Sequence, residues 1–337
     1  MLDKLHIFGS AHRPTKARIW LRFLKNSHKI FADVLYDVSR YVKYSSSFHL
    51  SGAGNLKSRI TAKYHEIEKG LSLPAPRKGF GVEKIDELTF LMNEYIARYG
   101  KDDFLRAPSS TLRAYVKFNE SHQLFDYPRK DKIQAMLASL DEYADVNGGV
   151  IGLDASEIYG ITEPVSDQFF LRRYSIRQFS DKPVAREDID SAVAIALKSP
   201  AVCNRQDGFV HVVENKELIK KMTDMHGGAR GFAEKIDKLL VITNKLTNFW
   251  ESGERNQCWI DGGLFSMSLI LGLHSKGIGS CCLNWSKRAK EDKAMRDLLN
   301  IPDSEVIIML LAVGHLPEHL NVAYSNRKPV TQARRYL

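Results

Sequence analysis

The sequence predicts two parts: an all-helical region in the first half of the chain and a layered α+β or α/β domain in the second half. Before residue 150, apolar residues recur at helical spacing with almost no strand-like alternation, whereas short β-branched runs alternate with helical patterns after it. Alternating strands and helices are typical of layered domains. The 337 residues suffice for two domains, and we place the helical region at residues 1–155 and the layered domain at residues 165–337.

The helical region is predicted from apolar spacing and from residues that begin or end helices. Phe31, Val34, Leu35, Val38 and Val42 form one apolar stripe of a first helix. Glycines and hydroxyl side chains delimit the others. Further helices are predicted over residues 56–69, 82–99 (ending before Gly100) and 130–143, and another begins at residues 108–111 with a hydroxyl N-cap.

The layered domain is predicted from three short apolar or β-branched runs and two amphipathic patterns. The strands are expected at residues 209–213, 238–243 and 305–313. One helix is expected at residues 188–197. A second is expected at residues 258–275, ending at Gly277, with Ile260, Leu264, Met267 and Leu271 on one face.

Composition and cysteine usage indicate a cytoplasmic protein. The longest apolar run, residues 306–313, is far shorter than the ~18–20 residues that span a bilayer. The N-terminus shows no signal-peptide pattern. The four cysteines form no CxxC pair and have no partners at metal-ligand spacing, so we predict reduced thiols and no metal site.

The net charge of +9 is concentrated near the N-terminus, where residues 1–50 hold nine Lys or Arg against three Asp. Such a segment is most often the solvated face of an amphipathic helix. The alternative is contact with phosphate or with an anionic membrane surface through residues 13–43. Because the excess belongs to one short segment, we do not expect a nucleic-acid partner.

Two segments of the second half carry groups suited to a ligand. Residues 172–179 (RRYSIRQF) place three guanidiniums and the Ser175 hydroxyl together, which suits a phosphate; the alternative is a solvated helix face. In residues 199–206 (SPAVCNRQ), Asn204 and Gln206 can present amide groups to the edge of a planar heterocycle. The alternative there is a proline turn in which Asn204 bonds the backbone.

Two later segments are weaker signals when taken alone. Residues 277–285 (GIGSCCLNW) allow close backbone approach to a flat ligand. They lack the third glycine and the following helix of a dinucleotide fingerprint, and otherwise indicate a helix end leading into a strand. Residues 325–329 (SNRKP) add Arg327 and Lys328, which alone indicate a basic tail.

Taken together and in order, these segments resemble the nitroreductase family. That family shows R-x-S-x-R-x-F, a helix, P-[SA]-x-x-N-x-Q, and a long apolar helix leading to G-[LI]-G-[ST]. It closes with a hydrophobic strand, a glycine and a late Arg or Lys pair. The corresponding residues here are 173–179, 200–206, 277–280 and Arg327-Lys328, and the resemblance covers about half of the chain.

The resemblance implies an α+β layered sandwich with a central, mostly antiparallel sheet flanked by helices, and a homodimer that holds FMN at its interface. Arg173, Ser175 and Arg327 are implied to hold the phosphate. Arg177 is implied to approach the pyrimidine edge of the flavin. The further residues implied to bind FMN are Tyr174, Asn204, Gln206, Cys282 and Leu283, the last two through backbone near the reactive flavin N5.

Three features differ from the compact members of the family. The loop reads Gln206-Asp207-Gly208 where Gln-Pro-Trp is usual, and Ala201 replaces a small hydroxyl residue. The helical N-terminal half is an extension, similar to that of nitroreductase-like proteins from polysaccharide gene clusters. In the region that shapes substrate choice, residues 244–259, the candidate substrate contacts are Phe249, Trp250 and Arg255; the alternative is that they pack a dimer interface.

The function implied by the resemblance is an FMN-dependent oxidoreductase. It transfers hydride from NADH or NADPH through flavin N5 to an organic acceptor such as a nitro compound or a quinone, and needs no catalytic side chain. One alternative is a dehydrogenase or dehalogenase on the same scaffold. Another is a degenerate flavin domain that acts as a scaffold through its basic N-terminal helix.

Overall fold

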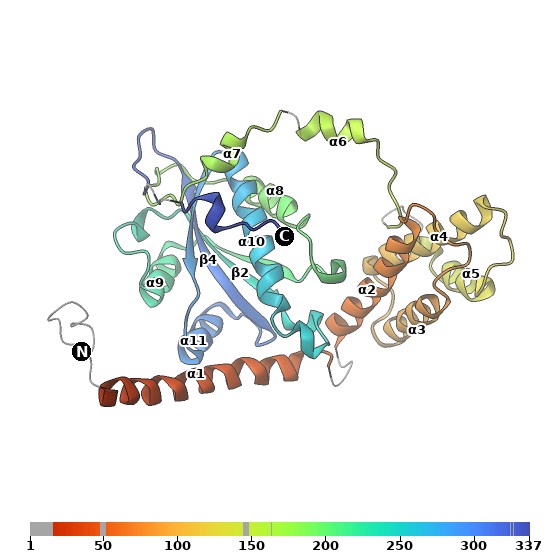
Figure 1. Ribbon diagram of the computed structural model, residues 1–337, viewed down its shortest axis with the longest axis horizontal. Helices are drawn as coiled ribbons and strands as arrows, with labels where there is room; N and C mark the ends of the chain where they lie inside the picture. Colours follow the sequence, from red (N-terminus) through yellow and green to blue (C-terminus); the bar gives the residue numbers. More distant parts are fainter. Residues whose placement is uncertain (1–15, 48–51, 144–147, 163, 324, 326) are drawn as a thin grey trace.

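The computed structural model describes residues 16–47, 52–143, 148–162, 164–323, 325 and 327–337 (Figure 1). Within these residues, no helix is both long enough and apolar enough to cross a membrane. The second half of the chain is an α+β sandwich, and the first half of the described chain is helical without strands.

One antiparallel sheet organises the second half of the chain. Its strands lie in the order β1 (Gly208–Val213), β2 (Lys238–Lys245), β4 (Glu305–His315) and β3 (Ile278–Asn284). Helices α8 (Arg186–Ala196) and α10 (Gln257–Ser275) cover one face, and α9 (Lys216–His226) and α11 (Ala289–Leu299) cover the other. The predicted fold class, with its antiparallel sheet flanked by helices, is confirmed.

The central strands are apolar because both of their faces are buried. Along β2, Leu239 and Val241 belong to the core beneath α9 and α11, whereas Leu240 and Ile242 belong to the core beneath α8 and α10. Successive side chains of a strand point to opposite faces, so burial on both sides removes the polar alternation of a half-exposed strand.

The first half contains a separate helical bundle, made of α2 (Ala53–Leu71), α3 (Val82–Tyr99), α4 (Arg106–Ser121) and α5 (Lys130–Ser139), with its own apolar core. The bounds predicted for α3 are confirmed. The start predicted for α4 is wrong, because this helix begins at Arg106 without a hydroxyl cap. Asp102 instead caps the preceding 3-10 turn by accepting a bond from the Phe104 amide at 3.2 Å.

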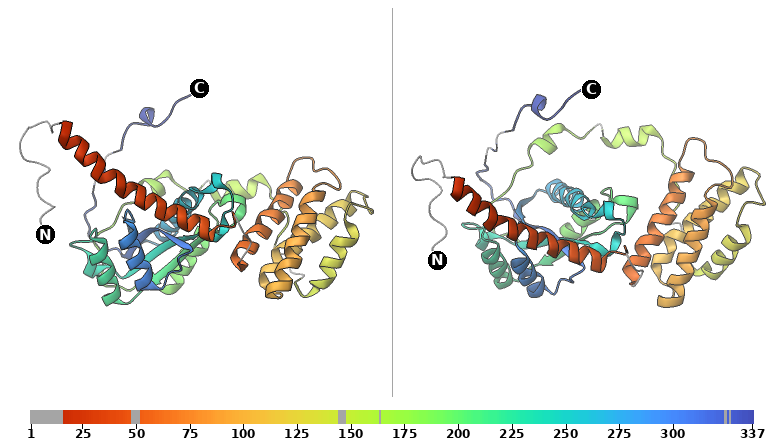
Figure 2. Two further views of the ribbon diagram at one scale, coloured as in Figure 1. Left: turned by 90° about the horizontal axis from the view of Figure 1, so that it is seen from below. Right: turned by 60° about the horizontal axis from the view of Figure 1, so that its bottom comes forward.

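The short helices α6 (Ala155–Thr162) and α7 (Asp167–Leu171) lie on the segment that connects the bundle to the sheet half (Figure 1). The long helix α1 (Lys16–Tyr44) precedes the bundle but lies along the sheet half beside α11 (Figure 2). The Arg40 guanidinium donates to the Asp303 carbonyl at 3.0 Å, and the Tyr36 hydroxyl donates to Asp292 at 2.8 Å. Arg288 donates to Asp33 at 3.1 Å.

The apolar stripe of α1 is not packed into the core of the chain. Because the polar side of α1 contacts the sheet half, the residues predicted to form the stripe are all exposed, as is Ile30. Helix α10 behaves similarly. Its predicted face carries Ile260, Leu264 and Met267, which are 44–54% exposed, whereas Phe265 and Leu269 supply the buried face. Periodicity identified these faces correctly as apolar, but neither forms the core of this chain.

Candidate functional site

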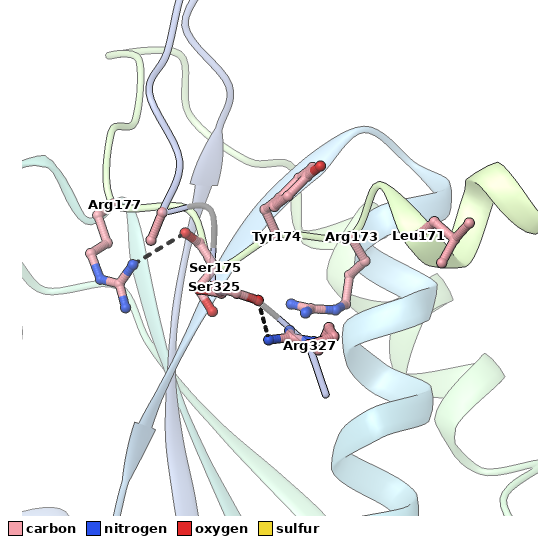
Figure 3. Close-up of a pocket in the computed structure, with 8 residues that line it drawn as sticks. Leu171, Arg173, Tyr174, Ser175, Arg177, Ser325 and Arg327 are labelled. Carbon is pink, nitrogen blue, oxygen red and sulfur yellow. Dashed lines mark hydrogen bonds between the residues drawn. The ribbon is translucent and has the colours of Figure 1, made fainter. Parts of the chain in front are cut away.

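Residues from the end of α7 and from the C-terminal tail enclose a cavity of about 290 Å³, called here the anion cavity (Figure 3). Three guanidiniums contribute to its wall, and none of its described lining residues is acidic. An uncompensated cluster of arginines suits an anion, and most of all a phosphate. The lining residues are Leu171, Arg173, Tyr174, Ser175, Arg177, Ala323, Ser325 and Arg327.

The arginine segment is fixed to the end of the sheet. The Ile176 amide donates to the Ser280 carbonyl at 2.9 Å, and Ser175 forms a parallel bridge with Ser280 of β3. A Cβ on Gly279 would lie 3.0 Å from the Ile176 Cγ2 atom, so this glycine admits the side chain of Ile176. At Gly279 the close approach is made by the chain itself, and the approach of a flat ligand to residues 277–285 stays a prediction.

The three cavity arginines lie around Ser175. Figure 3 shows Arg173 and Arg327 beside each other and Arg177 on the other side of Ser175. Arg327 donates to the Ser325 carbonyl at 2.6 Å and Arg177 to the Ser175 carbonyl at 3.5 Å. These backbone contacts orient the guanidiniums without neutralising them.

The predicted β3 residues lie at the same end of the domain. Burial raises the pKa of the Cys282 thiol, while the positive charge of Arg173 acts in the opposite direction. Cys282 keeps part of its surface exposed although neighbouring atoms desolvate its thiol, whereas Leu283 is buried in the core. The structure therefore brings Arg173, Arg177, Arg327 and Cys282 to one end of the sheet.

The 200–206 loop lies elsewhere along α10. Its Val202 amide donates to the buried Asp261 carboxylate at 3.0 Å, near the N-terminal end of that helix. Near the other end of α10, His274 lines a second cavity together with Arg173. From Asp261 to His274 the helix axis rises by roughly 20 Å. One chain therefore does not bring Asn204 and Gln206 to the anion cavity.

The 200–206 loop has an unusual backbone. Cys203, Asn204 and Gln206 have φ angles of 49°, 54° and 49°, in the left-handed region that non-glycine residues seldom adopt. Between them lies Arg205, which is 5% exposed. The family motif leaves this position variable, so Arg205 could not be singled out from the sequence.

Asp207 and Gly208, which stand where the family usually has Pro-Trp, pack against the core. Asp207 is 2% exposed and accepts a bond from the Asn244 side chain at 2.5 Å. Burial, followed by repulsion from Asp261, raises the pKa of Asp207 to about 7. A Cβ on Gly208 would lie 2.7 Å from the Phe265 ring, so glycine is needed for this packing.

The three candidate substrate contacts lie in two different environments. Phe249 is fully buried in a core cluster, so the prediction that it contacts substrate is wrong for this chain. Trp250 and Arg255 line a groove of about 630 Å³ between α10 and the apolar face of α1. This groove was missed from the sequence, because spacing along α1 does not show which segment lies opposite it.

The second half of the chain is thus an antiparallel α+β sandwich with an arginine-lined cavity at one end of its sheet. Two stretches of it, residues 171–230 and 224–315, match the nitroreductase family model. The part of the chain that is similar to this family is thus the half that contains the sheet and the anion cavity.

Relatives and solved structures match the same half. A protein from Archaeoglobus fulgidus, named as an inferred NADH dehydrogenase/NAD(P)H nitroreductase, is 28% identical over 145 residues, which are 42% of this chain and 80% of the relative. An FMN reductase (NAD(P)H) from Bacillus subtilis is 37% identical over 54 residues, 16% of this chain and 22% of the relative. A solved FMN-dependent nitroreductase from Clostridium difficile is 24% identical, with a TM-score of 0.40 over 47% of this chain and 91% of its own.

Proposed function

We propose that this protein is an FMN-dependent oxidoreductase that uses NADH or NADPH to reduce an organic acceptor. The observation that carries the proposal is the anion cavity, in which the family motif residues Arg173, Ser175 and Arg327 converge. Three guanidiniums without a carboxylate among the described lining residues fit the phosphate of FMN. The names of the relatives, which include NAD(P)H nitroreductase and FMN reductase, support the same activity. When bound, the flavin supplies hydride acceptance and electron transfer.

We assign roles to the cavity residues from the family motif, and their positions in the cavity support this assignment. Arg173 and Arg327 hold the phosphate together with the Ser175 hydroxyl. Arg177, on the other side of Ser175 (Figure 3), would approach the flavin ring, where its positive charge would favour the anionic reduced form. Tyr174 forms a wall shared by the anion cavity and the neighbouring cavity. The backbone of Cys282 and Leu283 would lie near the flavin ring once FMN is bound.

The 200–206 loop and the anion cavity lie at opposite ends of α10, and this separation supports a homodimer. A twofold axis through the middle of α10 pairs this helix antiparallel with its copy. The N-terminal end of one α10, which anchors the 200–206 loop, then lies at the C-terminal end of the other, beside the anion cavity. Asn204 and Gln206 of one copy thereby reach the flavin held by the other copy.

The exposed apolar faces of α1 and α10 have the extent that such a dimer requires. Six residues of α1 and four of α10 are each about half exposed, and the groove that α1 and α10 share connects the two faces. At roughly 80 Å² of exposed area each, they offer about 800 Å², which is what one partner contributes to a standard interface. The ten residues are Ile30, Phe31, Val34, Leu35, Val38, Val42, Trp259, Ile260, Leu264 and Met267.

The double variant Phe31→Glu with Leu35→Glu tests whether a second copy covers α1. We expect a shift from dimer toward monomer in light scattering, because two charges would be buried in an apolar interface. Ser39→Glu, on an exposed part of the same helix, is the matched control. An unchanged dimer with lost binding to anionic vesicles would instead favour membrane contact through residues 13–43, of which residues 13–15 lie outside the described chain.

The proposed activity is tested by the absorbance spectrum of the purified protein, before and after anaerobic addition of NADH and then NADPH. Flavin bands that bleach support the proposal and identify the donor. Flavin bands that persist would favour a dehydrogenase or dehalogenase on the same scaffold. A colourless protein that FMN does not restore would leave the scaffold alternative.

The phosphate assignment has its own test. Replacing Arg173 and Arg327 by Ala removes two charge-assisted bonds of about 1.5–3 kcal/mol each, so FMN affinity should fall by roughly 10²–10⁴-fold. The control replaces two exposed lysines, Lys117 and Lys221, and removes the same charge. A double arginine variant that purifies fully loaded would show that the phosphate binds elsewhere.

A further inference from the structure

Trp250 connects the helical bundle to the 200–206 loop. The guanidinium carbon of Arg59, on α2, lies 4.7 Å from the centre of the Trp250 ring, and that of Arg205 lies 4.0 Å from it. Both distances are within the range of a cation–π contact. One aromatic ring is thus held from two parts of the chain that are far apart in sequence.

Helix α2 also fixes the backbone next to Trp250. The Asn55 side chain donates to the Thr247 carbonyl at 2.9 Å, and the Ser58 hydroxyl donates to the Asn248 carbonyl at 2.9 Å. Asn55 and Ser58 are three residues apart and therefore lie on the same side of the helix as Arg59. This side of α2 is a clamp for residues 247–250.

The clamped residues hold Arg205 in turn. The Asn248 carbonyl accepts a second bond, from Arg205 Nη1 at 2.6 Å, and the Asn248 side chain donates to the Arg205 carbonyl at 2.9 Å. Arg205 also forms a two-pronged ion pair with Glu254 and donates from Nε to the Val202 carbonyl at 3.0 Å. The Asn248 carbonyl is therefore the junction at which Ser58 and Arg205 meet.

The loop needs such external support. Each residue in the left-handed region costs on the order of 1–3 kcal/mol, and such conformations persist only where surrounding contacts enforce them. Cys203, Asn204 and Gln206 all have positive φ. The side chains of Asn204 and Gln206 bond chiefly within the loop, so the buried Arg205 and the Asp261 contact with Val202 supply the restraint.

We propose that the helical bundle is a positioning element for the 200–206 loop. Through Ser58 and Arg59, α2 fixes residues 247–250 and with them Arg205, and Arg205 keeps Asn204 and Gln206 in the conformation that presents them to the flavin. The last step rests on the proposed function; the mechanical link from α2 to the loop does not. Ser58 and Arg59 are positioning residues, because they act through Arg205.

Hydrogen–deuterium exchange of the FMN-free full-length protein tests the link. In Arg59→Ala, exchange across residues 200–208 should rise about tenfold, which corresponds to about 1.4 kcal/mol, while exchange in β4 stays unchanged. Ser58→Ala, a smaller change at the same junction, should produce the same local effect and serves if Arg59→Ala fails to fold. Arg98→Ala, an exposed arginine on α3 paired with Glu94, is the matched control.

FMN titration of the same variants separates the link from the flavin assignment. Faster loop exchange together with weaker FMN binding supports both. Faster exchange with unchanged FMN binding supports the link and removes Asn204 and Gln206 from the flavin site. Exchange at residues 200–208 that is unchanged in both Arg59→Ala and Ser58→Ala, or that rises equally in β4, overturns the inference.

Discussion

Ionisation of Asp207 should weaken the fold at neutral and higher pH. This carboxyl is 2% exposed, and burial together with Asp261 raises its pKa from 3.8 to about 7. Arg205 and the Asn244 side chain act in the opposite direction but do not outweigh burial. Since the folded pKa exceeds the unfolded one, the stabilisation is complete below pH ~4 and is lost as pH rises through ~7.

The size of the effect follows from the width of that window. Between pH 5 and pH 7 the folded state keeps a proton that the unfolded state has released. At about 1.4 kcal/mol for each pH unit, the free energy of unfolding should fall by about 3 kcal/mol between pH 5 and pH 8.

Urea denaturation at pH 5, 6, 7 and 8 measures this fall, at one protein concentration so that association does not contribute. Asp207→Asn keeps the shape and removes the titration, so the wild type should lose about 3 kcal/mol more than the variant across the series. Asp190→Asn, at an exposed carboxylate of α8, controls for other titrating groups. Parallel pH profiles for wild type and Asp207→Asn would refute the reasoning.

Two further perturbations test the packing around the site and the division of the chain. Gly208→Val places a side chain against the Phe265 ring and should destabilise the fold by about 1–3 kcal/mol in thermal unfolding. Gly253→Val, where no atom lies within 4 Å of the added Cβ, should not. We propose that the boundary between the two parts of the chain lies between residues 155 and 165. Deletion of residues 1–150 should then leave a folded domain, which is less stable because the contacts of Arg40 are lost. Absence of soluble protein would indicate one integrated fold.

Helix boundaries were predicted well where the residue that ends the helix is adjacent to it in the sequence. Gly100 ends α3 because it follows the last turn in a conformation open to glycine, with φ 78°. The start of α4 was misplaced because Asp102 caps a 3-10 turn that runs directly into the helix. A hydroxyl at Ser109 suggested a cap, but inside the helix this residue is fully buried.

What an apolar face contacts cannot be obtained from periodicity. The spacing of Phe31 and Leu35 defines a stripe, and that of Ile260 and Leu264 defines another, but both would read identically if they faced the core of their own chain. The contacts of Arg40 and Tyr36 decide the matter for α1, since they turn its polar side inward. These contacts join residues more than 250 positions apart, which local sequence does not encode.

The N-terminal helices and the 200–206 loop meet at residues 247–251. A proline after Gln206, as in compact family members, would fix its own φ near −65° and restrict the residue before it. This chain has the buried Asp207 there, so the restraint must come from contacts elsewhere. Helix α2 reaches residues 247–250 through Ser58, and α1 reaches the adjoining Glu251 carbonyl through the Tyr41 hydroxyl at 2.6 Å. The observed φ of 49° at Gln206 differs from the extended backbone that a following proline favours. Both N-terminal elements thus converge on the segment that holds Arg205.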